Sequence, residues 1–435
     1  MDEATHVDHS SLSSENNELF VPPDIIRHIA TFRCIPPPCY TFNRVDDVYP
    51  LDAPGLAHHR CEWTAPELLL TSSAIYSDVY DLSWQSPRVH TVRALRSVLE
   101  GAFRPYLRRG ESRTPAECIR CIDIVMELSV TQWEDVLPTL FHSLSQLRIL
   151  ILSDRTHSFL SLDGCSPSNV PIGPRPWGST FPRSLTQVLL SSHNLGVNMD
   201  DLVLLSLEVP QLERLQVAKF NDPHYISLQD TVTSPSYFFP SLVWLSLGTF
   251  LRSPDDAISI NSRGAKAFTT LLRALSVASG LRRLTRLDIL YDIELPERFL
   301  QVHGPRIHTL SVPSKHHRSI RRHSSLSRFT SLKKLIFLLE PSVSPLAALT
   351  NPSLETIVFM NPPYPYLADV RQDAGNLRGL NDHIINEVLS AAPLFPALNR
   401  VVLSFPPSAS PAEIDTFRQR LAIANITVDI IIVDL

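Results

Sequence analysis

The stretch Phe239-Pro-Ser-Leu-Val-Trp-Leu-Ser-Leu247 decides the fold, because it belongs to a phrase that the chain repeats. The phrase is an apolar residue or Asn, then Pro, then any residue, then Leu-x-x-Leu-x-Leu. Leu245 and Leu247 are two residues apart, the spacing of side chains on one face of a β-strand, and Leu242 closes the turn that enters this strand. Proline has no N–H to donate and holds the preceding residue in an extended conformation. Pro240 therefore suits the bend ahead of the strand.

The phrase recurs with variations, and its starts are 22 to 44 residues apart. Most of these intervals overlap the period of about 20 to 29 residues that is typical of leucine-rich repeats. One such unit cannot bury its own apolar face, so neighbouring units must stack and form a parallel sheet. The sequence therefore predicts an α/β fold, a leucine-rich-repeat solenoid with a parallel concave sheet and irregular convex helices and loops. The expected starts are Ile119, Leu147, Leu185, Leu212, Leu242, Leu284, Ile307, Leu332, Leu354, Leu398 and Ile423.

Helical periodicity is found in several linkers between these strands. Helices are predicted over residues 132–143, 200–208, 262–278 and 380–391. A further helix is expected after Ser410, because Ser410 to Glu413 forms a capping box with proline at the first helical position. Ahead of the repeats, alternation over 76–84 predicts a first strand, and the pattern over 89–107 predicts a helix.

Four segments follow from this pattern. Residues 1–18 are rich in Ser, Asn and acidic residues and are expected to be a disordered tail. Residues 19–80 form a helical segment with a proline-dotted, irregular insertion, and residues 81–114 cap the amino-terminal end of the repeats. Residues 115–435 form the solenoid.

Composition limits the compartment and the partners. The chain has 39 Lys and Arg against 44 Asp and Glu, a net charge of -5, so bulk attraction to nucleic acid or an anionic membrane is not indicated. The polar, acidic amino terminus does not resemble a signal peptide, and the six cysteines lack paired spacing. No apolar run approaches the roughly 20 residues that span a bilayer. We expect a cytoplasmic or nuclear protein.

The strand phrase, the irregular repeat lengths and the short helix Val21-Pro-Pro-Asp-Ile-Ile-Arg-His-Ile29 together resemble F-box proteins with divergent leucine-rich repeats, of the kind abundant in mushroom-forming fungi. The repeat part of the resemblance covers about residues 115 to 430. The F-box part rests on the short helix and on residues 67–76, separated by an insertion of more than thirty residues. The family's tryptophan or basic residue after the second helix is missing, and no asparagine recurs where each strand closes.

The resemblance implies a role without catalysis and without a cofactor. F-box proteins bind the adaptor subunit of Skp-cullin-F-box ubiquitin ligases through the box and hold a substrate on the repeats. The adaptor-facing surface would then be Pro22, Pro23, Ile25, Ile26, Ile29, Leu68 and Leu69. Three alternatives stay open: the short helix only caps the repeats, the protein is a leucine-rich-repeat scaffold with no ubiquitin role, or it is an enzyme whose catalytic residues are far apart in the sequence.

The residues between the inward leucines of each strand should face the concave surface. Several of these residues are basic, and one is a tryptophan, which suits an acidic or phosphorylated protein substrate. The predicted substrate-binding residues are Arg214, Gln216, Trp244, Arg286, Asp288, Lys334 and Arg400. The alternative is an ordinary solvated sheet face with polar side chains.

Other motifs give weaker predictions. Cys34, Cys39, His58 and Cys61 are zinc-type ligands, but their spacing matches no common finger, so ordinary loop residues are favoured and no metal site is assigned. The basic run from Lys315 to Ser325 suits a nuclear-import signal, a kinase site or simply an exposed loop. Cys118-x-x-Cys121 lies in an apolar phrase and is expected in the core. No catalytic motif is found, and no catalytic residue is predicted.

Overall fold

A computed structural model describes most of the predicted repeat region. The described residues are 80, 84–108, 111–125, 138–153, 181–190, 197–220, 238–248, 263–277, 280–289, 293, 295–313, 325–338, 346, 350–360, 374–405 and 411–432. Within them, a 12-stranded sheet has the order β1-β4-β5-β6-β7-β8-β9-β10-β11-β12-β13-β14. All neighbouring strands run parallel. The predicted α/β arrangement with a parallel sheet is therefore confirmed.

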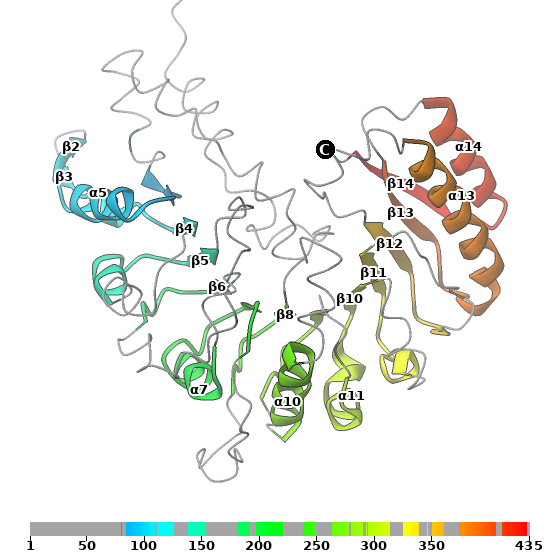
Figure 1. Cartoon of the computed structure of the whole chain (residues 1–435), viewed down its shortest axis with the longest axis horizontal. Coiled ribbons are helices and arrows are strands. Elements are labelled where there is room, and N and C mark those ends of the chain that lie inside the picture. Colours follow the sequence, from blue (N-terminus) through cyan, green and yellow to red (C-terminus); the bar gives the residue numbers. More distant parts are fainter. Residues whose placement is uncertain are drawn as a thin grey trace, which may run out of the picture.

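From β5 to β13, each strand pairs with the strand before it and the strand after it in the chain, an arrangement compatible with a solenoid, while β4 pairs with β1 and β5. We call β4 to β14, with their helices, the repeat array. In Figure 1 the strands follow one another along the inner side of an arc, and the helices lie on its outer side. The strands are β1 (Arg88–Val89), β4 (Cys121–Val125), β5 (Ile149–Ser153), β6 (Gln187–Leu190), β7 (Arg214–Val217), β8 (Trp244–Leu247), β9 (Arg286–Ile289), β10 (Thr309–Pro313), β11 (Lys334–Leu338), β12 (Thr356–Met360), β13 (Arg400–Phe405) and β14 (Thr427–Ile432).

The helices match the predictions in most linkers. They are α5 (Val92–Ala102), α7 (Met199–Glu208), α10 (Arg263–Val277), α11 (Glu297–His303), α13 (Ala374–Ala391) and α14 (Pro411–Ala422), with short 3-10 turns η2 (Pro115–Glu117), η4 (Gly304–Arg306), η6 (Ser325–Arg328) and η9 (Ala392–Leu394). The helix predicted over 132–143 is described only from residue 138, where the backbone is helical to 143. The helix α11 was not predicted. A separate antiparallel hairpin of β2 (Tyr106–Arg108) and β3 (Glu111–Arg113) follows α5.

A tight turn precedes most strands of the repeat array. The amide N–H of Leu242 donates to the carbonyl oxygen of Phe239 at 3.2 Å, and the equivalent bond from Leu398 to Phe395 measures 2.9 Å. Proline occupies the second position of this turn at Pro240, where its fixed φ fits and no N–H is required. The proline in the repeated phrase therefore marks a turn, as the sequence predicts.

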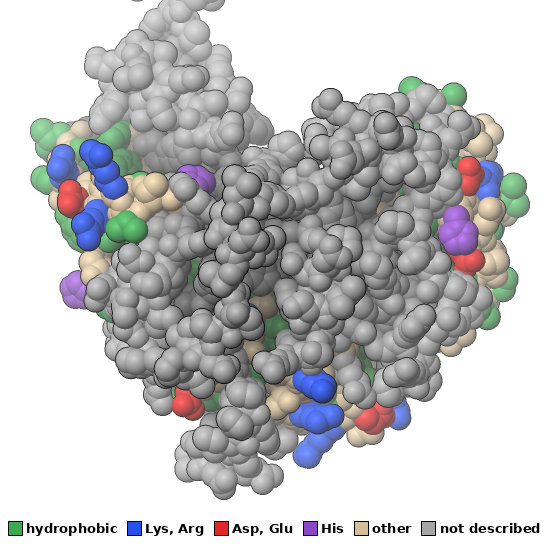
Figure 2. Space-filling model, viewed as in Figure 1, with side chains coloured by type: hydrophobic (Ala, Val, Ile, Leu, Met, Phe, Trp, Pro, Cys, Tyr) green, Lys and Arg blue, Asp and Glu red, His purple; other side chains and the backbone are tan. Residues whose placement is uncertain are grey.

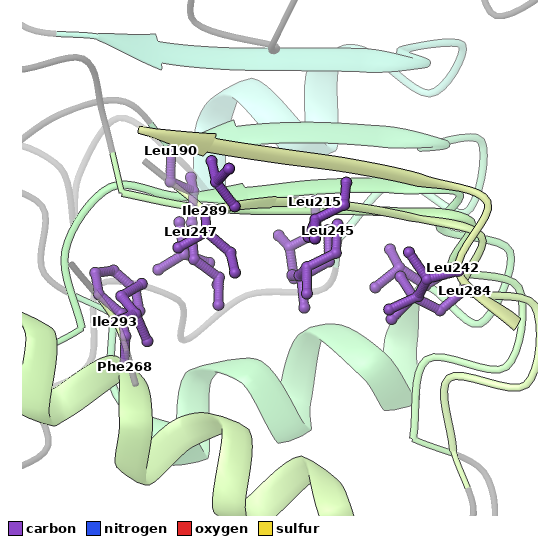
Figure 3. Close-up of a cluster of buried hydrophobic side chains, with 14 of the residues drawn as sticks. Leu190, Leu215, Leu242, Leu245, Leu247, Phe268, Leu284, Ile289 and Ile293 are labelled. Atoms are coloured by element: carbon purple, nitrogen blue, oxygen red, sulfur yellow. The ribbon is translucent and has the colours of Figure 1, made fainter. Parts of the chain in front are cut away.

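The leucines of the phrase form a continuous core on the outer side of the sheet. Leu242, Leu245 and Leu247 are 0–2% exposed, and each lies beside the equivalent residue of the next strand. Figure 3 shows these layers, with Leu242 against Leu284, Leu215 against Leu245, and Leu247 beside Ile289. Burying one such side chain contributes about 1.5–3 kcal/mol, so the array gains stability with every repeat.

Two expectations are wrong. In the stretch 76–84, the described residues Tyr80 and Trp84 have helical backbone where a strand is predicted, and the first described strand is β1. Ile423 does not begin the last phrase, since its side chain is 85% exposed, and Ile426, at 2%, takes that place three residues later. The predicted disordered tail, the F-box-like segment with Leu68 and Leu69, and the Cys34 to Cys61 region lie outside the described residues.

Candidate functional site

The inner face of the sheet carries two rows of side chains that run across the strands. Partner residues on neighbouring parallel strands lie about 4.8 Å apart, so each row is a continuous line. The first row is Cys121, Ile149, Gln187, Arg214, Trp244, Arg286, Thr309, Lys334, Thr356, Arg400 and Thr427. The second row is Asp123, Ile151, Leu189, Gln216, Ser246, Asp288, Ser311, Ile336, Val358, Val402 and Asp429.

The chemistry of the inner face changes along the array. Near β4 to β6 it is mainly apolar, and Ile149, Ile151 and Leu189 belong to a small hydrophobic cluster separate from the main core. In the middle, from β7 to β10, the second row is polar. Beyond β10 the second row becomes apolar again, with Ile336 and Val358 fully buried. The polar middle is therefore bounded by apolar side chains on both sides.

Trp244 is the centre of this polar region. Its ring lies between two arginines on the flanking strands, with the guanidinium carbon of Arg286 3.6 Å and that of Arg214 4.6 Å from the ring centroid. A cation over an indole ring is attracted by about 0.5–2 kcal/mol, more when it is desolvated. Trp244, Arg214 and Arg286 are only 3%, 1% and 8% exposed. These cation–π contacts therefore operate away from solvent.

Asp288 connects the same residues through hydrogen bonds. Its Oδ2 accepts from Nε1 of Trp244 at 2.5 Å, and its Oδ1 accepts from Nε of Arg286 at 3.0 Å and from Oγ of Ser311 at 2.6 Å. Asp288 is 0% exposed. A buried carboxylate is stable only when it is paired and hydrogen-bonded, and these three donors meet that requirement.

Gln216 extends the polar region toward β7, and Ser246 lies between it and Asp288 in the second row. The amide nitrogen of Gln216 donates to the carbonyl oxygen of Gly248 at 3.5 Å, a long bond. Both side chains are fully buried, and neither Oε1 of Gln216 nor Oγ of Ser246 has a hydrogen-bond partner among the described residues. We call Arg214, Gln216, Trp244, Arg286 and Asp288, with Ser246 and Ser311, the central cluster.

Five of the seven predicted substrate-binding residues belong to the central cluster, which the structure brings together as one buried group. The other two, Lys334 and Arg400, lie farther along the first row and are partly exposed. Arg400 donates from Nε to Asp429 on the next strand, and the side chains of this pair are 37% and 49% exposed. An ordinary solvated face does not describe the central cluster, because its members are at most 8% exposed.

The sequence prediction missed the pairing within the cluster. Asp288 follows Arg286 by two residues in the same strand, so both side chains point to one face, and this spacing was the available signal. The position of Trp244 between two arginines in the first row was a second signal. The adaptor-facing residues predicted from Pro22 to Leu69 lie outside the described ranges.

The predicted core position of the Cys118-x-x-Cys121 motif is confirmed for Cys121, which is buried in β4, while Cys118 is half-buried. The Sγ of Cys118 lies 3.6 Å from the hydroxyl of Tyr106, and burial together with this contact raises the pKa of that hydroxyl above its ordinary value. Neither Cys118 nor Cys121 is part of a disulfide bond. Cys118 and Cys121 therefore have a packing role at the start of the repeat array.

Within the described part of the chain, no group of three His, Cys, Asp or Glu side chains is placed to hold a metal ion. None of its helices has the length and apolar character needed to cross a bilayer. Comparison with protein-family models and with curated proteins finds no match to this sequence.

Proposed function

We propose that the chain is a noncatalytic substrate-recognition subunit of a Skp-cullin-F-box type ubiquitin ligase, acting in the cytoplasm or nucleus. In this proposal the repeat array is built of leucine-rich repeats and holds a protein substrate, while the helix at Val21 to Ile29 binds the ligase adaptor. The supporting observation is the single parallel sheet of the repeat array, with its helices on the outer side. Stacked repeats of this kind present an extended inner surface that suits a protein partner.

The inner face has features that suit binding more than catalysis. The carboxylate of Asp288 is occupied by three donors, and the guanidinium group of Arg286 is occupied by Trp244 and Asp288. Groups held this firmly stabilise the sheet at its middle. Lys334 and Arg400 are basic side chains of the first row that remain partly exposed, and in this proposal they contact the partner.

The ligase role is tested by capture of purified adaptor subunit on immobilised chain. Wild type should retain the adaptor, and a triple variant with Ile25, Ile26 and Ile29 changed to Asp should lose it. A matched control changes three exposed apolar residues to Asp, Leu107 in the hairpin and Leu207 and Ile423 in the repeat array, and should behave as wild type. Failure of wild type to bind the adaptor would remove the ubiquitin role and favour a scaffold without it.

The substrate surface is tested separately by charge reversal. Chemical cross-linking in cell extract, with mass spectrometry of the captured proteins, should show partners of wild type that are lost from a Lys334→Glu/Arg400→Glu variant. The matched control is Arg93→Glu/Arg96→Glu on α5, which makes the same change in net charge at two exposed positions away from the sheet face. If both variants lose the same captured partners to the same extent, the assignment of Lys334 and Arg400 as partner-contacting residues is refuted.

A further inference from the structure

The edge of the sheet where the strands begin is unusually basic at two consecutive turns. The turn before β9 runs from Leu281 to Leu284, and the turn before β10 runs from Gly304 to Ile307; each is closed by an N–H···O bond of 3.1 Å. Arg283 and Arg306 occupy the same position in these turns, directly before the buried apolar residue that starts the phrase. The equivalent residues of other turns are uncharged: Gln146, Ser184, Gln211, Ser241, Ser331, Ser353 and Ala397.

Further basic side chains extend this edge toward β11. His308 and Lys333 are neighbours in successive repeats, because the N–H of Lys333 donates to the carbonyl oxygen of His308 at 2.9 Å. Arg328 also lies close, since a Cβ placed on Gly304 would be 2.8 Å from the Arg328 carbonyl oxygen. We call Arg283, Arg306 and His308 the basic edge.

Among the described residues, the basic edge differs from its neighbours in forming no ion pair with an acidic side chain. Arg328 pairs with Glu297 at 2.6 Å, and Lys333 pairs with Glu355 at 3.2 Å, so their charges are compensated. Arg283, Arg306 and His308 are exposed and form no ion pair within the described residues. Figure 2 shows one face of the molecule, with the described Lys and Arg side chains in blue.

Helix electrostatics do not account for this arrangement. A cation stabilises the helix dipole by about 0.3–1 kcal/mol only within the last turn, and Arg283 lies beyond the last turn of α10, which ends at Val277. Moreover, α7 and α13 end without a basic residue in their last turn. The array therefore does not require a cation at this position, and the placement of two exposed arginines in register calls for another explanation.

We infer that the basic edge binds an anionic segment of the protein partner, carrying carboxylate or phosphate groups, in an extended conformation. Adjacent strands lie about 4.8 Å apart, so the two guanidinium groups can engage one phosphate or two acidic side chains, each through paired N–H donors. The edge adjoins Lys334, the first residue of β11, and therefore continues the proposed substrate surface. The inference rests on the proposed function in taking the array to hold a protein.

A protein segment fits this edge better than a nucleic acid. The whole chain has a net charge of -5, which opposes a long polyanion, whereas a short acidic segment meets only the local positive charge. Single-stranded nucleic acid also requires aromatic side chains on which bases stack. None of the exposed large hydrophobic side chains in the described residues lies at this edge; they are Phe103, Leu107, Leu207, Leu394 and Ile423.

The test measures fluorescence anisotropy of short labelled peptides with the full chain: one of alternating Glu and Ser, a second with the serines phosphorylated, and a neutral Gln and Ser control. Either anionic peptide should bind in low salt, and Arg283→Glu/Arg306→Glu should weaken binding about tenfold or more, the loss of roughly 1.4 kcal/mol. The Arg93→Glu/Arg96→Glu variant has the same net charge and should retain wild-type affinity. Melting temperatures of both variants verify that the fold is retained.

Three outcomes would overturn the inference: no binding of either anionic peptide, an equal loss in the two charge-reversal variants, or tighter binding of a single-stranded DNA oligonucleotide than of both peptides. Adaptor capture by the Arg283→Glu/Arg306→Glu variant separates the two proposals. A failure of adaptor capture in wild type with intact peptide binding removes only the ligase role. A failure of peptide binding with intact adaptor capture removes only the basic edge.

Discussion

Replacing Asp288 with Ala should destabilise the protein strongly, because three donors lose their common acceptor in a fully buried site. Arg286 would keep its charge with a side chain only 10% exposed. Removing one partner of a buried ion pair costs about 3–5 kcal/mol. The unpaired Trp244 and Ser311 donors act within the same network, so their losses are not added separately. We expect about 4 kcal/mol for Asp288→Ala and about 2 kcal/mol for Asp288→Asn, which keeps one acceptor oxygen.

The array contains a matched control for this change. Arg400 and Asp429 occupy the same two rows and form the same kind of pair, but their side chains are 37% and 49% exposed. An exposed pair contributes about 0–1 kcal/mol, so Asp429→Ala should cost no more than that. The comparison sets a buried carboxylate with three donors against an exposed carboxylate paired with one arginine.

The free energies of unfolding would be measured with guanidinium chloride, following far-UV circular dichroism for the whole array and tryptophan fluorescence for the region of Trp244. Each transition is fitted separately, because repeat arrays can depart from two-state unfolding. If Asp288→Ala and Asp429→Ala destabilise the chain equally, within about 0.5 kcal/mol, the central cluster does not stabilise the sheet as described.

Burial lowers the pKa of His303 below its ordinary value of 6.5. The unfolded chain therefore binds a proton at a higher pH than the folded chain does. The free energy of unfolding of wild type should fall as the pH falls from 6.5 toward the folded-state pKa, by up to about 1.4 kcal/mol per pH unit. In urea melts, His303→Gln should reduce this dependence of the unfolding free energy on pH. The control His308→Gln, at an exposed position, should leave the dependence as in wild type. Gly280→Ala should cost about 1–3 kcal/mol, because the new Cβ would overlap the carbonyl oxygen of Phe238; an unchanged melting temperature would contradict this. Asn351→Ala should cost about 1–3 kcal/mol, because its amide donates at 2.9 Å to two backbone carbonyls; a calorimetric loss under about 0.5 kcal/mol would count against it.

The repeated phrase was sufficient to predict the strands β4 to β13 and their order. Leu212, Leu242 and Leu284 are fully buried at the predicted starts, because a turn followed by two-residue alternation is a local pattern that stacking neighbours reinforce. The same pattern failed at Ile423, which follows α14 in a turn. Asn425, with φ of 57°, lies in the left-handed region that often ends a helix. Asparagine at that position was the signal that the strand begins later.

The failure at 76–84 has a different cause. Tyr80 and Trp84 are four residues apart, a spacing that fits both an alternating strand and a helix, and the structure shows the helical option with the two rings 6.2 Å apart. On the inner face, alternation correctly placed Arg214, Trp244 and Arg286 on one side. It carried no information on their exposure, because strand periodicity determines the face and not the contacts made across that face.

The central cluster also affects the order in which the repeats should unfold. Repeats of a solenoid interact mainly with their nearest neighbours, so unfolding can start at either end and proceed one repeat at a time. Asp288, however, joins Trp244 on β8 and Ser311 on β10 through one carboxylate, and Trp244 contacts Arg214 on β7. The four middle repeats are therefore linked into one cooperative unit. Amide hydrogen exchange should be slowest there and should mark a boundary at which fraying from both ends stops.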